Sequence, residues 1–236
     1  MQKIIKVADK VLNCIISLFI ILALLYSFWG IYDVVSIYSQ ADSHFTFGLN
    51  KGDTSLTEYQ AINDDVCAII EIPNTGIDYP VVQGKTNTEY INKSYDLKDC
   101  ISGSIFIDCN NSKYFTDFYT LFYGHRMDAS AMFGDIARFA EEAFFNNHPV
   151  GVLTLPTGEH DVEFFACCRV LANNKNFFDV GYANKNIGKV MKEIEATAVQ
   201  SRDIVVEEGD RIIALSTCED ATTSGRIILF GVVKGE

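Results

Sequence analysis

The chain has 236 residues, of which 48% are hydrophobic and 21% charged, enough for one domain with a sizeable core or two small ones. Four Pro and 16 Gly exclude a collagen-like or broadly disordered chain. The formal charge is −12, from 19 basic and 31 acidic residues. This balance argues against a general nucleic-acid binder, which would need a basic face to meet phosphates.

The N-terminus carries an apolar segment long enough to cross a bilayer. Lys3, Lys6 and Lys10 precede an uncharged run over residues 11–32, which is 22 residues long. At about 1.5 Å rise per residue, a helix of this length spans the roughly 30 Å hydrocarbon core. The lysines before the run, and Trp29 near its far end, predict a single-pass anchor with a cytoplasmic N-terminus and an extracellular remainder.

Two other interpretations fit this run less well. A signal peptide usually has an apolar core of about 7–15 residues followed by small residues, whereas bulky Phe28 and Trp29 end this longer run. A buried core helix would show a repeating polar face, but Asn13 and Ser17 are the clear polar interruptions. We therefore expect three parts: a cytoplasmic tip and transmembrane signal anchor over 1–35, a connector with some helical potential over 36–64, and an external domain over 65–236.

The part outside the anchor is more acidic than the whole. Without residues 1–35 the chain keeps 16 basic and 29 acidic residues, a net charge of −13. Such a domain has no electrostatic reason to lie on an anionic membrane surface. Its partners are expected to be neutral or basic, and nucleic acid is not among them.

Seven cysteines are present, and Cys14 lies in the apolar run. The external domain is large enough to fold without disulfides, and no CxxC pair or suitably spaced His suggests a structural zinc site. Cys67, Cys167 and Cys168 lie in apolar stretches and are interpreted as small buried hydrophobes. Cys218 differs, because its neighbourhood is polar and it follows a predicted strand.

Short apolar runs rich in Val, Ile, Phe and Tyr follow at fairly regular spacing and predict about eight strands. This number suits a closed barrel or a sandwich. Apolar residues at helical spacing predict helices over 131–145 and 186–199. The expected strands are 67–72, 79–83, 104–108, 119–124, 150–155, 162–171, 211–217 and 226–233.

One of the four histidines occupies a position typical of catalysis. His44, His148 and His160 are expected in exposed loops. His125 instead ends the apolar segment YTLFYG and opens a loop before a predicted helix. A polar residue at the mouth of a strand is a common site for chemistry.

Cys218 ends a strand in the segment IIALSTC, and alternation puts it on the same face as Ser216. If this strand and the next pair as a hairpin, Cys218 faces Arg226 across its mouth. On the local sequence alone, Arg226 equally fits an edge charge that solvates the strand end.

The motifs YGH at 123–125, LSTCED at 215–220 and Arg226 at the start of an apolar strand resemble the His, Cys and Arg motifs of sortases, in the same order. The blocks at 79–92, 103–108 and 131–136 are similar to class B sortases, and the resemblance covers about residues 65–233. It implies a mainly β fold with helical insertions: a sortase-like eight-stranded closed β-barrel preceded by the transmembrane helix.

The resemblance implies a cysteine transpeptidase of the thiol-hydrolase class at a Gram-positive cell surface. Such an enzyme would cleave an NPxTx-type C-terminal sorting signal of a secreted protein after Thr and form a thioacyl enzyme. It would then pass the acyl group to an amine of a peptidoglycan precursor or a pilin. Neither a metal nor an organic cofactor is needed.

The resemblance also implies roles for individual residues. Cys218 attacks as a thiolate, His125 transfers protons to and from the amines, and Arg226 anchors the substrate and stabilises the oxyanion. A disulfide from Cys218 to Cys109 or Cys100 would inactivate such an enzyme. Accessory positions are the Glu219 backbone N–H as a second oxyanion donor, Ser216 and Asn87 beside the site, and Tyr182 and Thr217 as substrate contacts, with Thr217 packing behind the site as its alternative.

Two other functions fit the same residues. A membrane-anchored cysteine peptidase would use the same groups and release its product to water. A non-catalytic, surface-binding β-domain would use none of them.

Overall fold

The computed structural model describes residues 2–41, 54–128, 130–207, 209–218 and 224–234. The chain forms two compact units, residues 1–39 and 40–236. The first unit consists of the helix α1 (Gln2–Ala41) up to residue 39. Among the described residues, its stretch Ile5–Tyr38 is the one helix long and apolar enough to cross a membrane. It exposes its apolar side chains all round, with Phe19 at 75%, as suits a helix surrounded by lipid. The helix extends beyond the predicted run 11–32, and the division of the chain at residues 35 and 64 stays a prediction.

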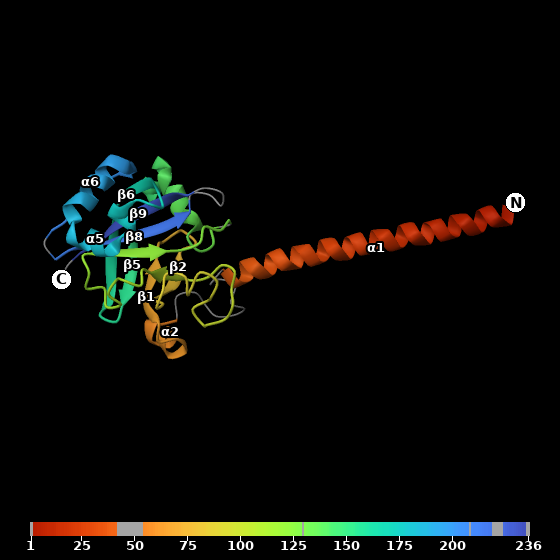
Figure 1. Cartoon of the computed structure of the whole chain (residues 1–236), viewed down its shortest axis with the longest axis horizontal. Helices are drawn as coiled ribbons and strands as arrows, with labels where there is room; N and C mark the ends of the chain where they lie inside the picture. The colour runs from red at the N-terminus through yellow and green to blue at the C-terminus, as the bar shows by residue number, and fades with distance from the viewer. Residues whose placement is uncertain (1, 42–53, 129, 208, 219–223, 235–236) are drawn as a thin grey trace. The chain divides into compact units, whose positions relative to one another are not determined.

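The second unit is an eight-stranded closed barrel (Figure 1). Its strands run in the order β5-β1-β2-β3-β4-β8-β9-β6, and pairing of β5 with β6 closes the ring. This confirms the predicted barrel and excludes a sandwich. The eight strands are β1 (Val66–Glu71), β2 (Asp78–Val82), β3 (Ile105–Ile107), β4 (Tyr119–Tyr123), β5 (Val150–Leu155), β6 (Gly158–Leu171), β8 (Arg211–Cys218) and β9 (Gly225–Val233).

A ninth strand, β7 (Ala198–Ser201), pairs with the outer edge of β6. The sequence predicts helix as far as Val199, but α6 (Ile187–Thr197) ends two residues earlier. Ala198 is already extended, with φ −62° and ψ 128°, and Ser201 pairs with Ala166. Strand pairing across the chain therefore overrides the local helical pattern.

The prediction of a single helix over 131–145 is wrong. The segment instead contains the 3-10 helix η2 (Gly134–Ala140) and the short helix α3 (Glu142–Asn147). Glu141 between them is extended, which interrupts the helix. Asp135 is buried and accepts a hydrogen bond from the turn between β1 and β2, so a tertiary contact competes with regular helix here.

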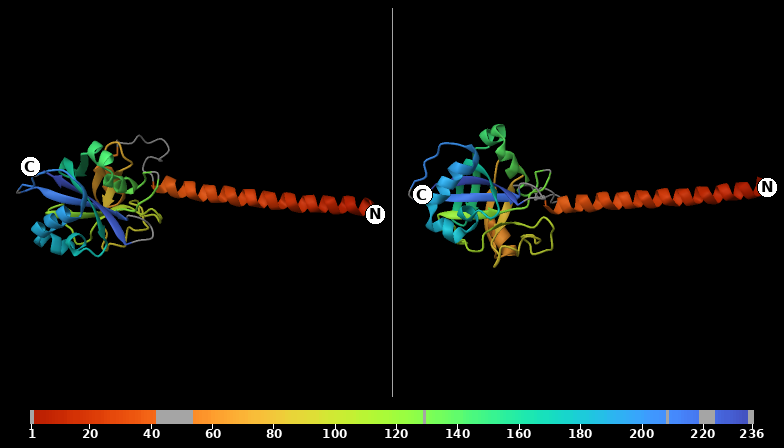
Figure 2. Two further views of the ribbon diagram at one scale, coloured as in Figure 1. Left: turned by 90° about the horizontal axis from the view of Figure 1, so that it is seen from above. Right: turned by 45° about the horizontal axis from the view of Figure 1, so that its top comes forward.

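Three helices cover one outer face of the barrel, as Figures 1 and 2 show: α4 (Lys175–Phe178), α5 (Val180–Lys185) and α6. Their side chains, including Phe177 and Val190, form one core with Ile212 and Ala214 of β8. Residues 212–217 are consequently buried on both faces of the strand. Ser216 lies on the same face of β8 as Ile212 and Ala214, and Thr217 lies on the opposite face.

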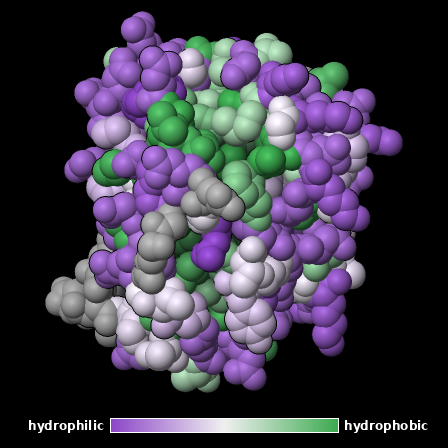
Figure 3. All heavy atoms as spheres, turned by 90° about the vertical axis from the view of Figure 1, so that its left-hand side faces the viewer, coloured by the Kyte–Doolittle hydropathy of each residue, from purple (hydrophilic) through white to green (hydrophobic). Residues whose placement is uncertain are grey.

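The flank that carries α5 and α6 is largely hydrophilic, with a smaller apolar area among the polar side chains (Figure 3).

The helix α2 (Leu56–Ile62), which precedes the barrel strands, begins with a capping box. Ser55 Oγ accepts from the Glu58 backbone at 3.4 Å, and the Glu58 carboxylate accepts from the Ser55 backbone at 2.7 Å. These bonds satisfy donors at the first turn, within the segment predicted as a connector with helical potential.

Candidate active site

The ends of β8 and β9 bring Cys218 and Arg226 together. The two strands pair antiparallel in continuous register from Arg211↔Val233 to Cys218↔Arg226. The predicted hairpin, with these two residues opposite each other at its mouth, is confirmed.

The end of β4 lies on the other side of β8. The two strands are parallel, and their last pair is Tyr123↔Ser216. The next residue, Gly124, still donates its backbone N–H to the Ser216 carbonyl at 3.2 Å. His125 and Cys218 each follow this last pair by two residues, so three neighbouring strand ends carry His125, Cys218 and Arg226, here called the row.

Gly124 allows the chain to leave β4 in a crowded place. A Cβ on this residue would lie 2.5 Å from Phe133 Cδ2 and 2.6 Å from Ile105 Cδ1. Phe133 in turn donates its backbone N–H to the His125 carbonyl at 3.0 Å. The backbone of His125 is thus held by the loop that follows it.

The His125 side chain is half-buried and its Nε2 lies 2.8 Å from the carbonyl oxygen of Ile91. Ile91 belongs to the loop between β2 and β3, far from His125 in the chain. The imidazole is therefore held from a second direction, independent of its own loop.

Arg226 is half-buried, and its Nη1 donates to the Gly225 carbonyl at 3.0 Å. Its charge acts on Tyr123 of β4. Burial raises the pKa of Tyr123 well above its ordinary value, the Asp108 carboxylate raises it further, and Arg226 opposes both. The guanidinium is thus within electrostatic reach of a half-buried tyrosine that is hydrogen-bonded to a carboxylate.

Asp108 is the centre of a polar network at this end of the barrel. It is 2% exposed and accepts hydrogen bonds from Asn87 Nδ2 at 2.7 Å, Tyr123 Oη at 3.0 Å and the Asn110 backbone at 2.9 Å. The Asn87 amide oxygen also accepts from the Cys109 backbone at 2.7 Å. Asn87, predicted as an accessory residue, thereby joins Tyr123, which lies next to the row.

Asp108 and Tyr123 were not predicted as site residues. The sequence carries a weak signal for each: an acidic residue that closes the apolar segment SIFID, and the tyrosine of the YGH motif. Neither signal is enough alone, because an Asp at a strand end is usually solvated.

The other predicted positions differ in their surroundings. Ser216 and Thr217 are both buried, and within the described part of the chain Thr217 Oγ1 has no hydrogen-bond partner. Tyr182 lies on α5, where its hydroxyl accepts from Lys189 Nζ at 2.8 Å, and no contact recorded for the described residues joins it to the row. Glu219 lies outside the described residues. The roles of these four residues stay predictions.

Three of the cysteines away from Cys218 are poor nucleophiles. Cys67, Cys167 and Cys168 are buried, which confirms their interpretation as small hydrophobes. Burial raises the pKa of their thiols to about 12, about 12 and about 11. Cys100 and Cys109 are free thiols.

Two of the other histidines are not the exposed loop residues that the sequence predicts. His148 is half-buried and stacks on Phe144 with ring centroids 4.0 Å apart, and His160 lies on β6. His44 is outside the described residues. Among the residues that are described, no group of three or more His, Cys, Asp or Glu could hold a metal ion.

The known proteins that are similar to this chain in sequence or in structure are described as sortase B or as class B sortases. No protein-family model matches the chain. Sortase B of Listeria monocytogenes is 30% identical over 181 residues, covering 75% of this chain and 72% of that protein. Sortase B of Staphylococcus aureus is 28% identical over 179 residues, covering 74% and 73%.

Solved structures agree with these relatives. A Streptococcus pyogenes class B sortase involved in pilus biogenesis superimposes with a TM-score of 0.70 and 38% identity, covering 78% of this chain and all (100%) of that one. Clostridium perfringens sortase B gives a TM-score of 0.66 and 30% identity over 75% of this chain and 98% of that one.

Proposed function

The chain belongs to the class B sortases and is a cysteine transpeptidase, and from this premise we propose its substrates, its site and its place in the cell. Its donor substrates are secreted proteins with an NPxTx-type C-terminal sorting signal, cleaved after Thr. Its acceptor is an amine of a peptidoglycan precursor or a pilin. Because water can also resolve the thioacyl enzyme, the reaction falls in the class of thiol hydrolases.

The observation that carries the proposal is the row of His125, Cys218 and Arg226 at the adjacent ends of β4, β8 and β9. The Cys218 thiolate attacks the carbonyl carbon of the signal Thr and forms a tetrahedral intermediate. Protonated His125 gives its proton to the leaving amine, and the thioacyl enzyme remains. The incoming amine then attacks, loses a proton to neutral His125 and releases Cys218.

Arg226 suits the stabilisation of the negative oxygen in both tetrahedral states. A guanidinium stays charged at every physiological pH and presents its donors in a fixed plane. The Tyr123 and Asp108 network lies within reach of its charge. The Glu219 backbone N–H, Ser216 and Asn87 complete the proposed surroundings of the oxyanion, with Thr217 and Tyr182 as substrate contacts.

The apolar helix supports a location at the cell membrane. Residues 11–32 lie within the stretch that is long and apolar enough to span a bilayer. Lys3, Lys6 and Lys10 precede it, which favours a cytoplasmic N-terminus and an extracellular catalytic domain. That domain then meets its substrates as they emerge from secretion.

The negative charge of the external part is compatible with an amine acceptor, which carries a positive charge before it reacts. Outside residues 1–35 the chain carries a net charge of −13. An amine is commonly cationic before it reacts, and such a surface attracts rather than repels it.

The test is a peptide assay on the full chain in detergent micelles. We expect an NPxTx-type peptide to acylate Cys218, detected by intact mass, and an added diaminopimelate or glycine oligomer to yield the amide product. Cys218→Ala should abolish cleavage, while the matched variant Cys67→Ala removes a buried thiol of β1 and should retain it.

Each other outcome rejects the proposal in its own way. Acid product alone, even with excess amine, would identify a peptidase. If the peptide forms no adduct on Cys218, and Cys218→Ala behaves like the parent chain in the assay, the protein is a non-catalytic surface-binding domain.

A further inference from the structure

We propose that the backbone carbonyl of Ile91 fixes the tautomer of His125, so that Nδ1 is the ring nitrogen that exchanges protons with the substrate amines. The tautomer follows from the geometry of the protein itself. Its catalytic meaning rests on the proposed function, in which His125 is the proton-transfer group.

The argument begins with the chemistry of the contact. His125 Nε2 lies 2.8 Å from the Ile91 carbonyl oxygen, a hydrogen-bond distance. A carbonyl oxygen can only accept, so Nε2 must carry the hydrogen. In neutral His125 the lone pair is then on Nδ1, because the bond made by one ring nitrogen determines the state of the other.

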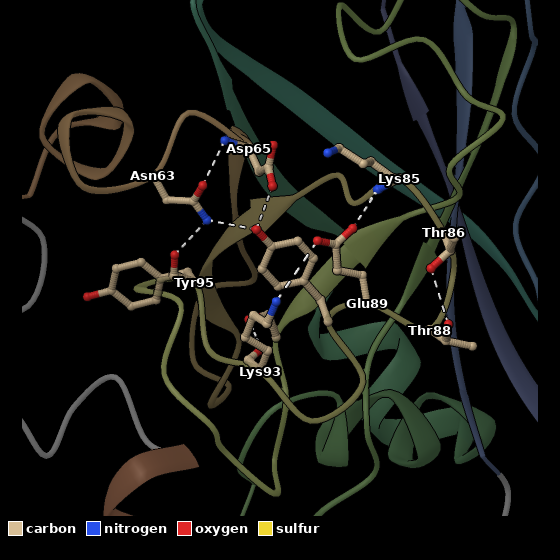
Figure 4. A network of polar contacts seen from close by, with 10 residues as sticks. Asn63, Asp65, Lys85, Thr86, Thr88, Glu89, Lys93 and Tyr95 are labelled. Carbon is tan, nitrogen blue, oxygen red and sulfur yellow. Dashed lines mark hydrogen bonds and ion pairs between the residues drawn. The ribbon is translucent and has the colours of Figure 1, made fainter.

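The Ile91 carbonyl belongs to a loop that is itself firmly held (Figure 4). The Glu89 carboxylate accepts from the Lys85 backbone at 2.8 Å and also pairs with Lys93 at 3.9 Å. The hydroxyl of the buried Tyr90, the residue before Ile91, donates to Asp65 at 2.7 Å. The acceptor thus has a defined position before substrate arrives.

Asn63, which lies between α2 and β1, holds the same loop through its side chain. Its amide nitrogen donates to the Tyr90 hydroxyl at 2.9 Å and to the Tyr95 carbonyl at 2.7 Å, and its amide oxygen accepts from the Asp65 backbone at 3.0 Å (Figure 4). Both sides of Ile91 are therefore tied to one polar network that does not include the proposed catalytic residues.

Gly103 permits the close approach behind the carbonyl. It has a φ of +61°, and a Cβ built on it would lie 2.3 Å from the Ile91 oxygen and 2.7 Å from the Tyr90 oxygen. Any larger residue must displace the acceptor of His125 or move itself. Gly103 is accordingly the position from which the contact can be disturbed without altering a side chain of the site.

The proton balance follows from the tautomer. In the imidazolium both nitrogens carry hydrogen, and Nε2–H remains bound to the Ile91 carbonyl. The Nδ1–H bond breaks as the leaving amine gains its proton, and Nδ1 forms a new bond to hydrogen when the incoming amine loses one. The ring returns to its starting state after each turnover.

The direct test is NMR of the full chain labelled with ¹⁵N-histidine in detergent micelles, at a pH where the ring is neutral. Long-range ¹H–¹⁵N correlations distinguish the two tautomers without any assay of activity. We expect His125 to be protonated on Nε2, with its signals assigned by their loss in His125→Gln. A ring protonated on Nδ1, or an even mixture of both tautomers, would overturn the proposal.

The chain offers an internal control for this experiment. His148 makes the opposite contact, with Nδ1 at 2.8 Å from the Phe144 carbonyl oxygen. It should therefore show the Nδ1–H tautomer in the same spectrum, and His148→Gln identifies its signals. Two histidines with opposite tautomers in one sample exclude a general effect of solvent or detergent.

A second measurement connects the tautomer to turnover. Gly103→Ala should disturb the Ile91 carbonyl, mix the tautomers of His125 and lower kcat roughly ten- to hundredfold, which is a partial loss of the ~10²–10⁴-fold that general acid–base catalysis contributes. Gly158→Ala is the matched control, because Gly158 also has a positive φ (+131°) but no neighbouring atom within 4 Å.

The outcomes separate this proposal from the proposed function. Unchanged kcat in a folded Gly103→Ala protein with mixed tautomers would overturn the role of Nδ1, while peptide cleavage by the parent would still stand. If Gly103→Ala does not fold, the spectrum of the parent protein decides. Failure of the parent to acylate Cys218 would reject the proposed function and leave the tautomer result intact.

Discussion

Asp108 illustrates how a single buried carboxylate can organise one end of the barrel. It follows β3, and its donors come from the loop after β2 through Asn87, from β4 through Tyr123 and from its own turn through Asn110. Hydrogen bonds to an ionised acceptor are stronger than neutral ones, and a buried charge must be satisfied in this way. We infer that Asp108 positions Asn87 and Tyr123 beside the proposed catalytic row.

Asp108→Asn tests this role at the scale of the residue. The new amide has one acceptor oxygen where the carboxylate had two, and its NH2 group meets donors. We expect the free energy of unfolding to fall by about 1–3 kcal/mol, measured by urea unfolding, together with a lower kcat/KM. Asp161→Asn, at an exposed position on β6, should change neither; equal behaviour of the two variants would contradict the inference.

The parallel pairing of β4 and β8 is the decisive contact at the scale of the element. Parallel neighbours need a long connection, and here that connection contains η2, α3, β5, β6, the helices α4–α6 and β7. The last ladder contact, from the Gly124 N–H to the Ser216 carbonyl, leads directly into His125. The packing of Gly124 against Phe133 and Ile105 therefore sets the direction in which His125 leaves the strand.

Gly124→Ala tests the packing at this strand end. Its methyl group would enter space occupied by Phe133 and Ile105, at 2.5 and 2.6 Å. Overpacking of this kind costs about 1–3 kcal/mol of stability, and we expect kcat to fall because His125 is the next residue.

The control for this variant is Gly188→Ala on α6. No atom lies within 4 Å of a Cβ at that position, and Ala is a better helix former than Gly. Stability there should be unchanged or slightly higher. A Gly124→Ala protein as stable and active as the control would show that the strand end tolerates a side chain.

Over the whole molecule, the core holds ionisable groups that fold in their neutral form. Burial raises the pKa of the Cys67 thiol to about 12, that of Cys168 to about 11 and that of Tyr90 to about 12. In the unfolded chain a thiol has a pKa of about 8.5 and a tyrosine a pKa of about 10. Since each folded pKa lies above the unfolded one, these groups favour the folded state fully at neutral pH and lose that effect as pH rises.

We therefore expect the free energy of unfolding to be constant near pH 7–8 and to fall progressively between about pH 9 and 12. Urea unfolding of the full chain in detergent at pH 7.5, 9 and 10.5 measures this slope. Cys67→Ala removes one contributor and should show a shallower fall. A stability that stays constant or increases up to pH 10.5 would contradict the prediction.

Local features of the chain were predictable because they depend on neighbouring residues. Short apolar runs at fairly regular spacing indicated the eight barrel strands, and the short connection between Cys218 and Arg226 indicated the β8–β9 hairpin. Predictions failed where a distant partner competed with the local pattern. Pairing with β6 made residues 198–201 a strand, and the contacts of Asp135 accompany the split of the helix expected over 131–145.

The sequence by itself determined the apolar N-terminal helix, the strands of the barrel and the facing positions of Cys218 and Arg226, since each follows from composition, alternation or a short connection. Only the tertiary structure decided that the strand ends carrying His125 and Cys218 are neighbours, that Asp108 binds Asn87 and Tyr123, and that the Ile91 carbonyl binds His125. The physical reason is the same in all three cases. These contacts join segments far apart in the chain, and their register depends on how the barrel closes.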